Sequence, residues 1–258
     1  MPIVETATGA HLHYTERNPQ ASGAPIVAIH GLLGTAEIHL GPLLDWLADE
    51  GYRVIGLTLR GYGESSPKPR DFPYDFYHRD ARDTLAFLDA LHIDKAHLMG
   101  FSDGGETVMV AAGLAPERAA SVVAWGAVGS FGPELRPVLQ RTYPGTWISE
   151  DLKTLHGITD ADAFARAWVR ATTTMLDRGG DLSLSLAPNI TAPVLLLLGD
   201  QDTLNPQSYA EKFVQAAQKG RLEMLPGGHS VHEEQFERFK ELVGPFLRAA
   251  HAALPAIA

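Results

Sequence analysis

Short apolar runs alternate with longer amphipathic stretches along most of the chain. Five continuous runs rich in aliphatic residues lie at 25–31 (PIVAIHG), 52–58 (YRVIGLT), 96–102 (AHLMGFS), 120–128 (ASVVAWGAV) and 193–199 (PVLLLLG). Such runs are typical of parallel strands buried on both faces of a sheet. Segments between them, most clearly 75–91, carry apolar residues at helical spacing. The pattern predicts an α/β fold with a wound, mostly parallel sheet and helices on both faces, and the alternating segment 11–14 predicts antiparallel edge strands.

The alternation stops between residues 129 and 192, where no strand-like run occurs. Two helices are expected there, near 149–156 and 160–176, with proline and glycine residues around them. We therefore predict a helical cap at 129–192, inserted into a core formed by residues 1–128 and 193–258.

Composition narrows the class of protein. A chain of 258 residues, 45% hydrophobic and 20% charged, has the make-up of one sizeable globular domain. The formal net charge of -10 and the lack of a basic run exclude nucleic acid and anionic membranes as expected partners. The absence of cysteine excludes thiolate catalysis and cysteine-ligated zinc. The sequence begins without a charged and apolar leader, so we expect a soluble cytoplasmic protein.

The segment Gly100-Phe101-Ser102-Asp103-Gly104 fits the G-x-S-x-G pattern of a nucleophile elbow. It follows an apolar strand and precedes a helix-compatible stretch, which is the context in which a sharp turn exposes a reactive serine. A serine between glycines is otherwise a plain turn. The functional interpretation therefore depends on finding an acid and a histidine later in the chain, because a serine hydroxyl needs a base.

Asp202 and His229 are the expected partners of Ser102. Asp202 follows the most apolar run of the chain, and His229 follows the strand-like run 221–224. Asp200 is the alternative acid, but Asp202 lies further past the strand end and can reach the histidine, whereas Asp200 is expected to cap the turn. In these roles His229 takes the proton of Ser102, and Asp202 holds the imidazole in the required tautomer.

An oxyanion hole requires two backbone N–H groups close to the serine. The loop His30-Gly31-Leu32 follows the first parallel strand, and we expect the N–H groups of Leu32 and Asp103 to be the two donors. His30 is expected to be a structural hydrogen-bonding residue beneath this loop. His229 and His232 are three residues apart, but no third ligand completes a metal site. We expect neither a metal nor a cofactor.

Histidines and tryptophans elsewhere in the chain have a structural interpretation. His39, His97 and His156 are among those expected to be surface or packing residues. Trp147 and Trp168 are expected to line a pocket under the cap or to pack in the core.

Asp103 is an unexpected neighbour for a nucleophile, because its carboxylate raises the energy of a negatively charged tetrahedral intermediate. An α-amino ester reverses this effect, since its ammonium group lies one carbon from the attacked carbonyl and can pair with Asp103. The alternative is structural: a carboxylate at a helix N-terminus is stabilised by about 0.3–1 kcal/mol. The residues alone leave both interpretations open.

The order of serine, acid and histidine, the HG loop and the elbow resemble the α/β-hydrolase superfamily over essentially the whole chain. The stretches Arg70-Asp71-Phe72-Pro73 and Ser102-Asp103-Gly104-Gly105 are similar to the biphenyl hydrolase-like (valacyclovirase-like) proteins. This resemblance implies an α/β-hydrolase fold with an inserted helical cap, hydrolysis of α-amino acid esters, and a substrate-binding role for Asp103, which would hold the α-ammonium group.

The expected function is a serine hydrolase that cleaves small carboxylic esters through an acyl-enzyme and prefers α-amino acid esters. A general carboxylesterase without amino-group preference, with or without a perhydrolase side activity, is the first alternative. A ligand receptor that keeps the three residues but does not turn over substrate is the second. Ser102 argues against dehalogenase and epoxide hydrolase chemistry, because those reactions on this fold use a carboxylate nucleophile at the serine position.

Overall fold

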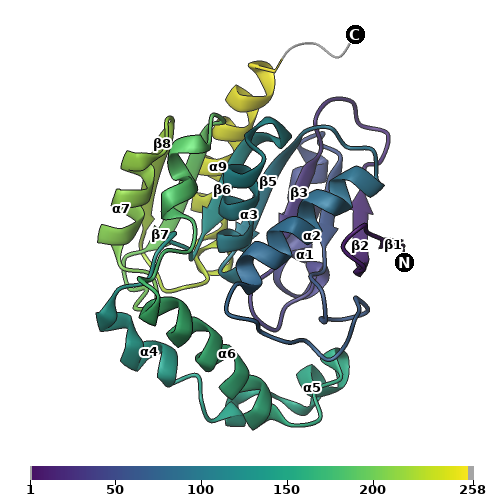
Figure 1. Cartoon of the computed structure of the whole chain (residues 1–258). Helices are drawn as coiled ribbons and strands as arrows, with labels where there is room; N and C mark the ends of the chain where they lie inside the picture. The colour runs from purple at the N-terminus through teal and green to yellow at the C-terminus, as the bar shows by residue number, and fades with distance from the viewer. Residues whose placement is uncertain (1, 255–258) are drawn as a thin grey trace.

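An eight-stranded sheet runs through the centre of the computed structural model, which describes residues 2–254 (Figure 1). Its strands are β1 (Ile3–Glu5), β2 (His11–Arg17), β3 (Ile26–Ile29), β4 (Val54–Leu57), β5 (Ala96–Phe101), β6 (Ala119–Trp125), β7 (Val194–Gly199) and β8 (Gly220–Leu225). The strand order is β1-β2-β4-β3-β5-β6-β7-β8, with the β1–β2 and β2–β4 pairs antiparallel and the others parallel. Every residue of β3 to β7 is buried. This confirms the interpretation of the apolar runs as strands covered on both faces.

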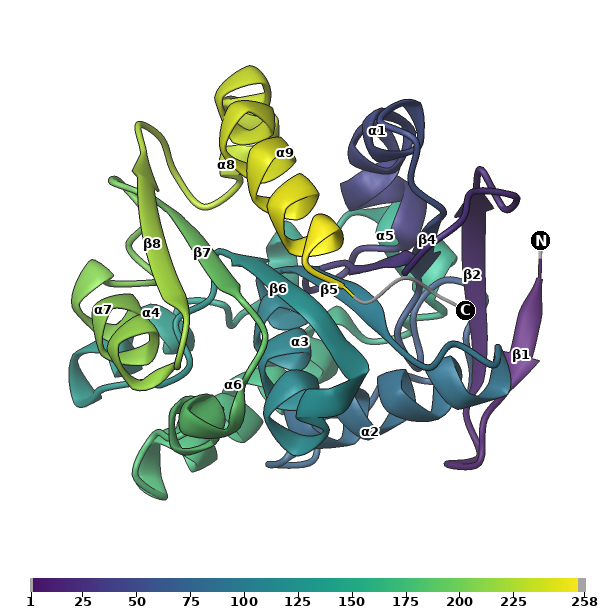
Figure 2. The ribbon, with the colours of Figure 1, turned by 90° about the horizontal axis from the view of Figure 1, so that it is seen from above.

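Helices cover both faces of this sheet. They are α1 (Ala36–Asp49), α2 (Phe76–Ala90), α3 (Asp103–Leu114), α4 (Arg136–Gln140), α5 (Glu150–His156), α6 (Ala161–Asp177), α7 (Gln207–Ala216), α8 (Val231–Glu234) and α9 (Phe236–Ala252). Figure 2 shows α1 and α9 on one side of the sheet and α2, α3 and α7 on the other. The core is divided accordingly: Leu44 and Phe239 pack in one cluster, and Phe87 and Met109 in the other. Within residues 2–254, no helix combines the length and the apolar character needed to cross a membrane.

Residues 129–192 lie between β6 and β7 in the chain and form helices, turns and one isolated β-bridge. The hydroxyl of Ser149 caps α5 by accepting the N–H of Leu152 at 3.3 Å, and α5 ends at Gly157 in the left-handed conformation, with φ 68°. The carboxylate of Asp160 then caps α6. These caps explain why both predicted helices are found at nearly the predicted bounds. In Figure 1, α4, α5 and α6 lie together beyond one end of the sheet.

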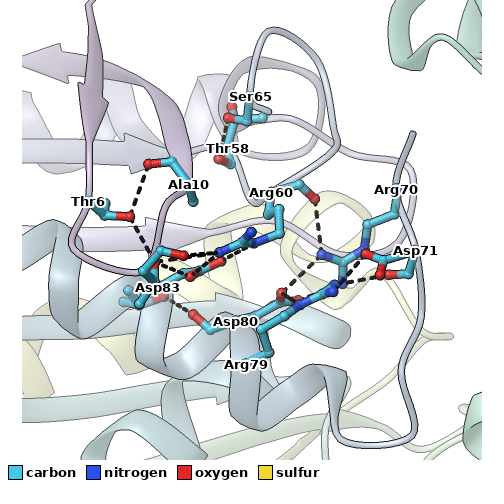
Figure 3. Close-up of polar contacts among 12 residues, drawn as sticks. Thr6, Ala10, Thr58, Arg60, Ser65, Arg70, Asp71, Arg79, Asp80 and Asp83 are labelled. Carbon is cyan, nitrogen blue, oxygen red and sulfur yellow. Dashed lines mark hydrogen bonds and ion pairs between the residues drawn. The ribbon is translucent and has the colours of Figure 1, made fainter. Parts of the chain in front are cut away.

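A buried network of charged side chains fixes the loop after β4 against α2 (Figure 3). The guanidinium of Arg70 donates to Asp80 at 3.0 and 2.5 Å and to the carbonyl of Arg60 at 3.0 Å. Arg60 in turn donates to both carboxylate oxygens of Asp83, at 2.6 and 2.7 Å. Each charge in this network is paired, as burial requires. The network therefore holds α2 in place, and α2 carries Tyr77 to the site described next.

Candidate active site

Ser102 lies on the sharp turn between β5 and α3. Its backbone has φ 54° and ψ −118°, a conformation that is strained for a residue with a Cβ, and its N–H donates to the carbonyl of Trp125 at 2.8 Å. Glycine is required on both sides: a Cβ on Gly100 would overlap the backbone of Gly104, and a Cβ on Gly104 would overlap the carbonyl of Ile29. The close packing of β3, β5 and α3 thus holds the serine in its strained position.

Ser102, His229 and Asp202 are joined by hydrogen bonds, although they are far apart in the sequence. The Nε2 atom of His229 lies 3.0 Å from Oγ of Ser102, and its Nδ1 atom lies 2.8 Å from Oδ2 of Asp202. With its proton on Nδ1, His229 donates to Asp202 and presents the lone pair of Nε2 to the serine hydroxyl. This is the arrangement that a general base requires. The structure therefore brings together the three residues that the sequence order predicted.

Further donors orient Asp202. The N–H of Leu204 donates to Oδ1 at 2.8 Å, and the side-chain amide of Asn205 donates to Oδ2 at 2.9 Å. Burial raises the pKa of Asp202, but the hydrogen bonds from His229, Asn205 and Leu204 together outweigh it and lower the pKa below its usual value. Asp200 instead accepts the N–H of Gly227 at 3.1 Å, in keeping with the turn role expected for it. Asp202 is thus the ionised partner of His229.

The loop after β3 lies against the serine. A Cβ on Gly31 would be 2.9 Å from Cβ of Ser102, and Leu32 is the next residue of this loop. Asp103, the other predicted oxyanion donor, is the first residue of α3. N–H groups in the first turn of a helix have no acceptor within that helix. Both positions are compatible with an oxyanion hole.

Two buried histidines hold the surrounding loops. His30 accepts the N–H of Leu59 at 3.0 Å, which confirms its structural role. His156, at the end of α5, accepts the N–H of Gly63 at 3.0 Å and donates to the carbonyl of Leu33 at 2.9 Å. Burial lowers the pKa of both rings, and the neutral form is the one that can accept these bonds. His156 therefore links α5 to the predicted oxyanion loop, a more specific contact than the packing role expected for it.

Asp103 is buried beside these residues, with 6% of its surface exposed. The hydroxyl of Tyr77 donates to its Oδ1 atom at 2.8 Å, whereas its Oδ2 atom accepts no hydrogen bond from any of residues 2–254. The indole N–H of Trp168, on α6, is also buried and has no acceptor among them. Burial raises the pKa of Asp103, while the hydrogen bond from Tyr77, the charge of Arg70 and the nearby indole N–H of Trp168 oppose that rise. Oδ2 thus lacks a hydrogen bond of normal geometry, although the indole N–H of Trp168 lies close to the carboxylate.

Glu106 is a second buried carboxylate, one helical turn after Asp103 and 3% exposed. Its Oε1 atom accepts the N–H groups of Val128 at 2.8 Å and Gly129 at 3.0 Å, while its Oε2 atom lies 3.5 Å from the hydroxyl of Ser183. Burial raises the pKa of Glu106 to about 7; the two backbone donors oppose the rise, and the charge of Asp103 adds to it. The site therefore contains two carboxylates on one face of α3.

A cavity of about 40 Å³ connects these groups. Its walls include Tyr77, Ser102, Asp103, Glu106, Trp168 and His229. A volume of this size holds a few atoms at most. The space therefore holds only a small group, and the rest of a substrate has to lie outside it.

Some residues of the cavity were not predicted from the sequence, and one predicted residue lies elsewhere. Trp168 lines the cavity, but Trp147 is 47% exposed and donates its indole N–H to a neighbouring carbonyl, so a pocket or core role is wrong for Trp147. Tyr77, Glu106 and Asn205 also line the cavity without having been predicted. Glu106 carried a usable signal, since it is a charged residue within the otherwise small and apolar stretch that follows the elbow.

Known proteins resemble this chain in both sequence and fold. A family model described as alpha/beta hydrolase fold matches residues 24–155. The serine hydrolase BPHL of Homo sapiens is 32% identical over 248 residues, which cover 93% of this chain and 84% of that protein. A thermophilic esterase from Thermogutta terrifontis superposes with a TM-score of 0.74 at 22% identity, covering 97% of this chain and 98% of the esterase. An enol-lactonase from Burkholderia xenovorans superposes with a TM-score of 0.72 at 24% identity, covering 96% of this chain and all of the lactonase. At such identities, the two solved structures establish a shared fold.

Proposed function

This chain belongs to the α/β-hydrolase fold family and is a hydrolase of that kind; from this premise we propose that it cleaves carboxylic esters through an acyl-enzyme and prefers esters of α-amino acids. Ser102 is the nucleophile, His229 the general base and Asp202 the partner of the base. The amino acid preference rests on one observation, the buried and unpartnered Oδ2 atom of Asp103 beside the serine.

The reaction begins when His229 accepts the hydroxyl proton of Ser102 and the serine oxygen attacks the ester carbonyl. The N–H groups of Leu32 and Asp103 stabilise the oxyanion that forms. Asp202 stabilises the imidazolium, which gives its proton to the departing alcohol. Water then attacks the acyl-enzyme with His229 again as the base, and the serine is restored. The hydrogen bonds of 3.0 and 2.8 Å already align this proton transfer.

The position of Asp103 sets the preference for an ammonium group. A neutral acyl group leaves its Oδ2 atom buried without a partner, whereas the α-ammonium of an amino acid ester pairs with it. Removing the partner of a buried charge costs about 2–5 kcal/mol, which is about 30-fold to several-thousand-fold in a rate constant. The role of a simple helix-end carboxylate accounts less well for this residue, because such a role does not require a buried carboxylate with one oxygen lacking a hydrogen bond of normal geometry.

Residues 129–192 serve, in this proposal, as a cap on a core formed by residues 1–128 and 193–258. The cavity receives Trp168 from this segment, and His156 fastens the segment to the loop that carries Leu32. Because the cavity is small, it encloses the ammonium group and the carbon that bears it. The alcohol part of the ester lies outside and contributes less to selectivity.

The test compares one matched pair of esters, an L-alanine benzyl ester and its des-amino counterpart, on the wild type and on Asp103→Asn at constant ionic strength. Asparagine keeps the size of the side chain and the backbone N–H while removing the charge. We expect kcat/KM to favour the amino ester by about 100-fold in the wild type and the preference to collapse in the variant. The variant Ser102→Ala should lose the acylation burst and turnover.

Other outcomes would refute distinct parts of the proposal. Equal rates for both esters in the wild type would make the protein a general carboxylesterase and Asp103 a helix-end residue. Turnover retained in Ser102→Ala would refute the acyl-enzyme. Labelling of Ser102 by a fluorophosphonate without multiple turnover of any ester would indicate a ligand receptor.

A further inference from the structure

Glu106 is a buried charge that the mechanism above does not use. It lines the same cavity as Asp103 and Ser102, one turn further along α3. Residues at this spacing on a helix have Cβ atoms about 5–6 Å apart. Both side chains line one cavity and the charge of Asp103 raises the pKa of Glu106, so a small cation in that cavity lies near both carboxylates.

A structural role explains only half of the Glu106 side chain. Its Oε1 atom accepts two backbone N–H groups, from Val128 and Gly129, and so fixes the loop after β6 to α3. Its Oε2 atom has a single long contact of 3.5 Å, to the hydroxyl of Ser183. A glutamine would fix the loop equally well without the desolvation of a charge. The loop role therefore does not explain why this residue is a glutamate.

We propose that Glu106 is a specificity-determining residue that supplies the second carboxylate of the ammonium site, so that the α-ammonium group binds between Oδ2 of Asp103 and Oε2 of Glu106. The inference rests on the proposed amino acid ester hydrolysis and names a second residue for its selectivity. An ammonium group has three N–H donors. The open oxygen of Asp103 satisfies one of them, and Oε2 of Glu106 is free to accept another.

Few other charges act on Glu106. The titratable groups that share its cavity are Asp103 on its own helix, Tyr77 of α2 and His229 after β8. Neither lysine nor arginine is among the described residues that line the cavity. Burial and the neighbouring Asp103 raise the pKa of Glu106 to about 7, so the empty site is partly protonated at neutral pH. A bound ammonium group supplies the missing positive charge and favours the ionised form.

The ionisation of Glu106 gives ammonium binding a definite direction of pH dependence. Glu106 is neutral below its raised pKa and negative above it, so its attraction for an ammonium group grows as the pH rises from 6 to 8. An opposite charge within about 4–6 Å shifts a pKa by about 1–3 units. By linkage, the affinity that Glu106 adds for the cation then grows about five- to tenfold over this pH range.

The experiment measures the preference for L-alanine benzyl ester over its des-amino counterpart, as the ratio of kcat/KM values, at pH 6 and pH 8. It compares the wild type with Glu106→Gln, which keeps an acceptor for both loop N–H groups, and with Glu237→Gln. The Glu237 side chain is 83% exposed on α9, so that variant controls for the change in net charge. A change of pH that acts on the catalytic step affects both esters alike, and ionisation of the substrate amine affects all three enzymes alike, so neither alters the comparison.

The wild-type preference, divided by that of Glu106→Gln, should rise about five- to tenfold from pH 6 to pH 8, while Glu237→Gln matches the wild type. An unchanged preference in Glu106→Gln at both pH values would overturn the inference and leave Glu106 a loop ligand. If the wild type itself shows no preference for the amino ester, the proposed function fails instead, which is a separate result.

A second measurement needs only the folded wild type and the same variant. L-alaninol carries the ammonium group but cannot be hydrolysed. Calorimetric titration of the protein with L-alaninol at pH 7, in two buffers of different ionisation enthalpy, should show release of about half a proton by the wild type and less by Glu106→Gln. Equal proton release by both would contradict the two-carboxylate site.

Discussion

His156→Ala tests how strongly one side chain fastens the 129–192 segment to the predicted oxyanion loop. The ring is fully buried and makes two hydrogen bonds to backbone groups, accepting from Gly63 at 3.0 Å and donating to Leu33 at 2.9 Å. Both partners lie in loops outside the segment. Removing the ring therefore leaves one N–H and one carbonyl without partners and opens a cavity between the two parts of the structure.

The expected loss of stability follows from those two groups. A buried backbone group left without a partner costs about 1–3 kcal/mol, so His156→Ala should lower the free energy of unfolding by about 3 kcal/mol. In a chain of this size, 1 kcal/mol corresponds to about 2–4 °C in Tm, so the expected fall is roughly 6–12 °C. Because Leu33 follows Leu32, the proposed oxyanion donor, kcat should also fall, while KM changes less.

Thermal unfolding and urea denaturation at pH 7.5 measure the loss, with Leu155→Ala as the control. Leu155 is the neighbouring residue and is 36% exposed, so its truncation should cost well under 1 kcal/mol. If His156→Ala lost less than about 0.5 kcal/mol, the two hydrogen bonds would not be fastening the segment, and the role given to His156 would be wrong.

Three further predictions concern the framework of the site. Gly104→Ala should prevent folding to the native state, because the added Cβ overlaps the carbonyl of Ile29; a native-like circular dichroism spectrum and Tm would contradict this. Asp80→Asn leaves the buried guanidinium of Arg70 without its charged partner and should cost about 3–5 kcal/mol in urea denaturation; a midpoint equal to that of the wild type would refute the role of this pair. Stability should fall as the pH drops from 7.5 to 5, because burial lowers the pKa of three histidines to about 4, below the value of 6.5 that they have when unfolded. These are His39, His97 and His232. The contribution of each neutral ring to the free energy of unfolding is complete above pH 6.5 and falls on acidification, by about 2 kcal/mol per ring at pH 5. Urea midpoints that stay constant over this range would show that the three rings are accessible to protons.

The parts of the site that the sequence predicted are those with a local or topological cause. Five apolar runs became buried strands because parallel strands are covered on both faces. Ser102, Asp202 and His229 each follow a strand, and parallel strands bring their carboxyl ends to one edge of the sheet. Their positions directly after strands therefore predict that the three residues lie close together in space.

The residues that the sequence did not predict have causes that lie far away in the chain. Tyr77 matters because α2 packs beside α3, and its hydroxyl reaches Asp103 across 26 positions. His156 and Gly63 are 93 positions apart. Neither contact changes the spacing of apolar residues in the segments it joins, so the hydropathy pattern does not predict these contacts. Trp147 shows the converse case. A tryptophan is expected to be buried, but this one lies on the surface.

The two electrostatic requirements of the proposed site oppose each other. Stabilising an oxyanion requires positive potential near Ser102, and the N–H groups at the start of α3 provide part of it. Asp103 and Glu106, on the same helix, supply negative potential a few ångströms away. An α-ammonium group removes the conflict because it neutralises the carboxylates while lying one carbon from the developing negative charge. That pairing gains strength as the charge on the carbonyl oxygen grows, since the repulsion it cancels grows as well. Selectivity for the ammonium group should therefore be expressed in kcat as well as in KM, and a preference confined to KM would show that Asp103 assists binding alone.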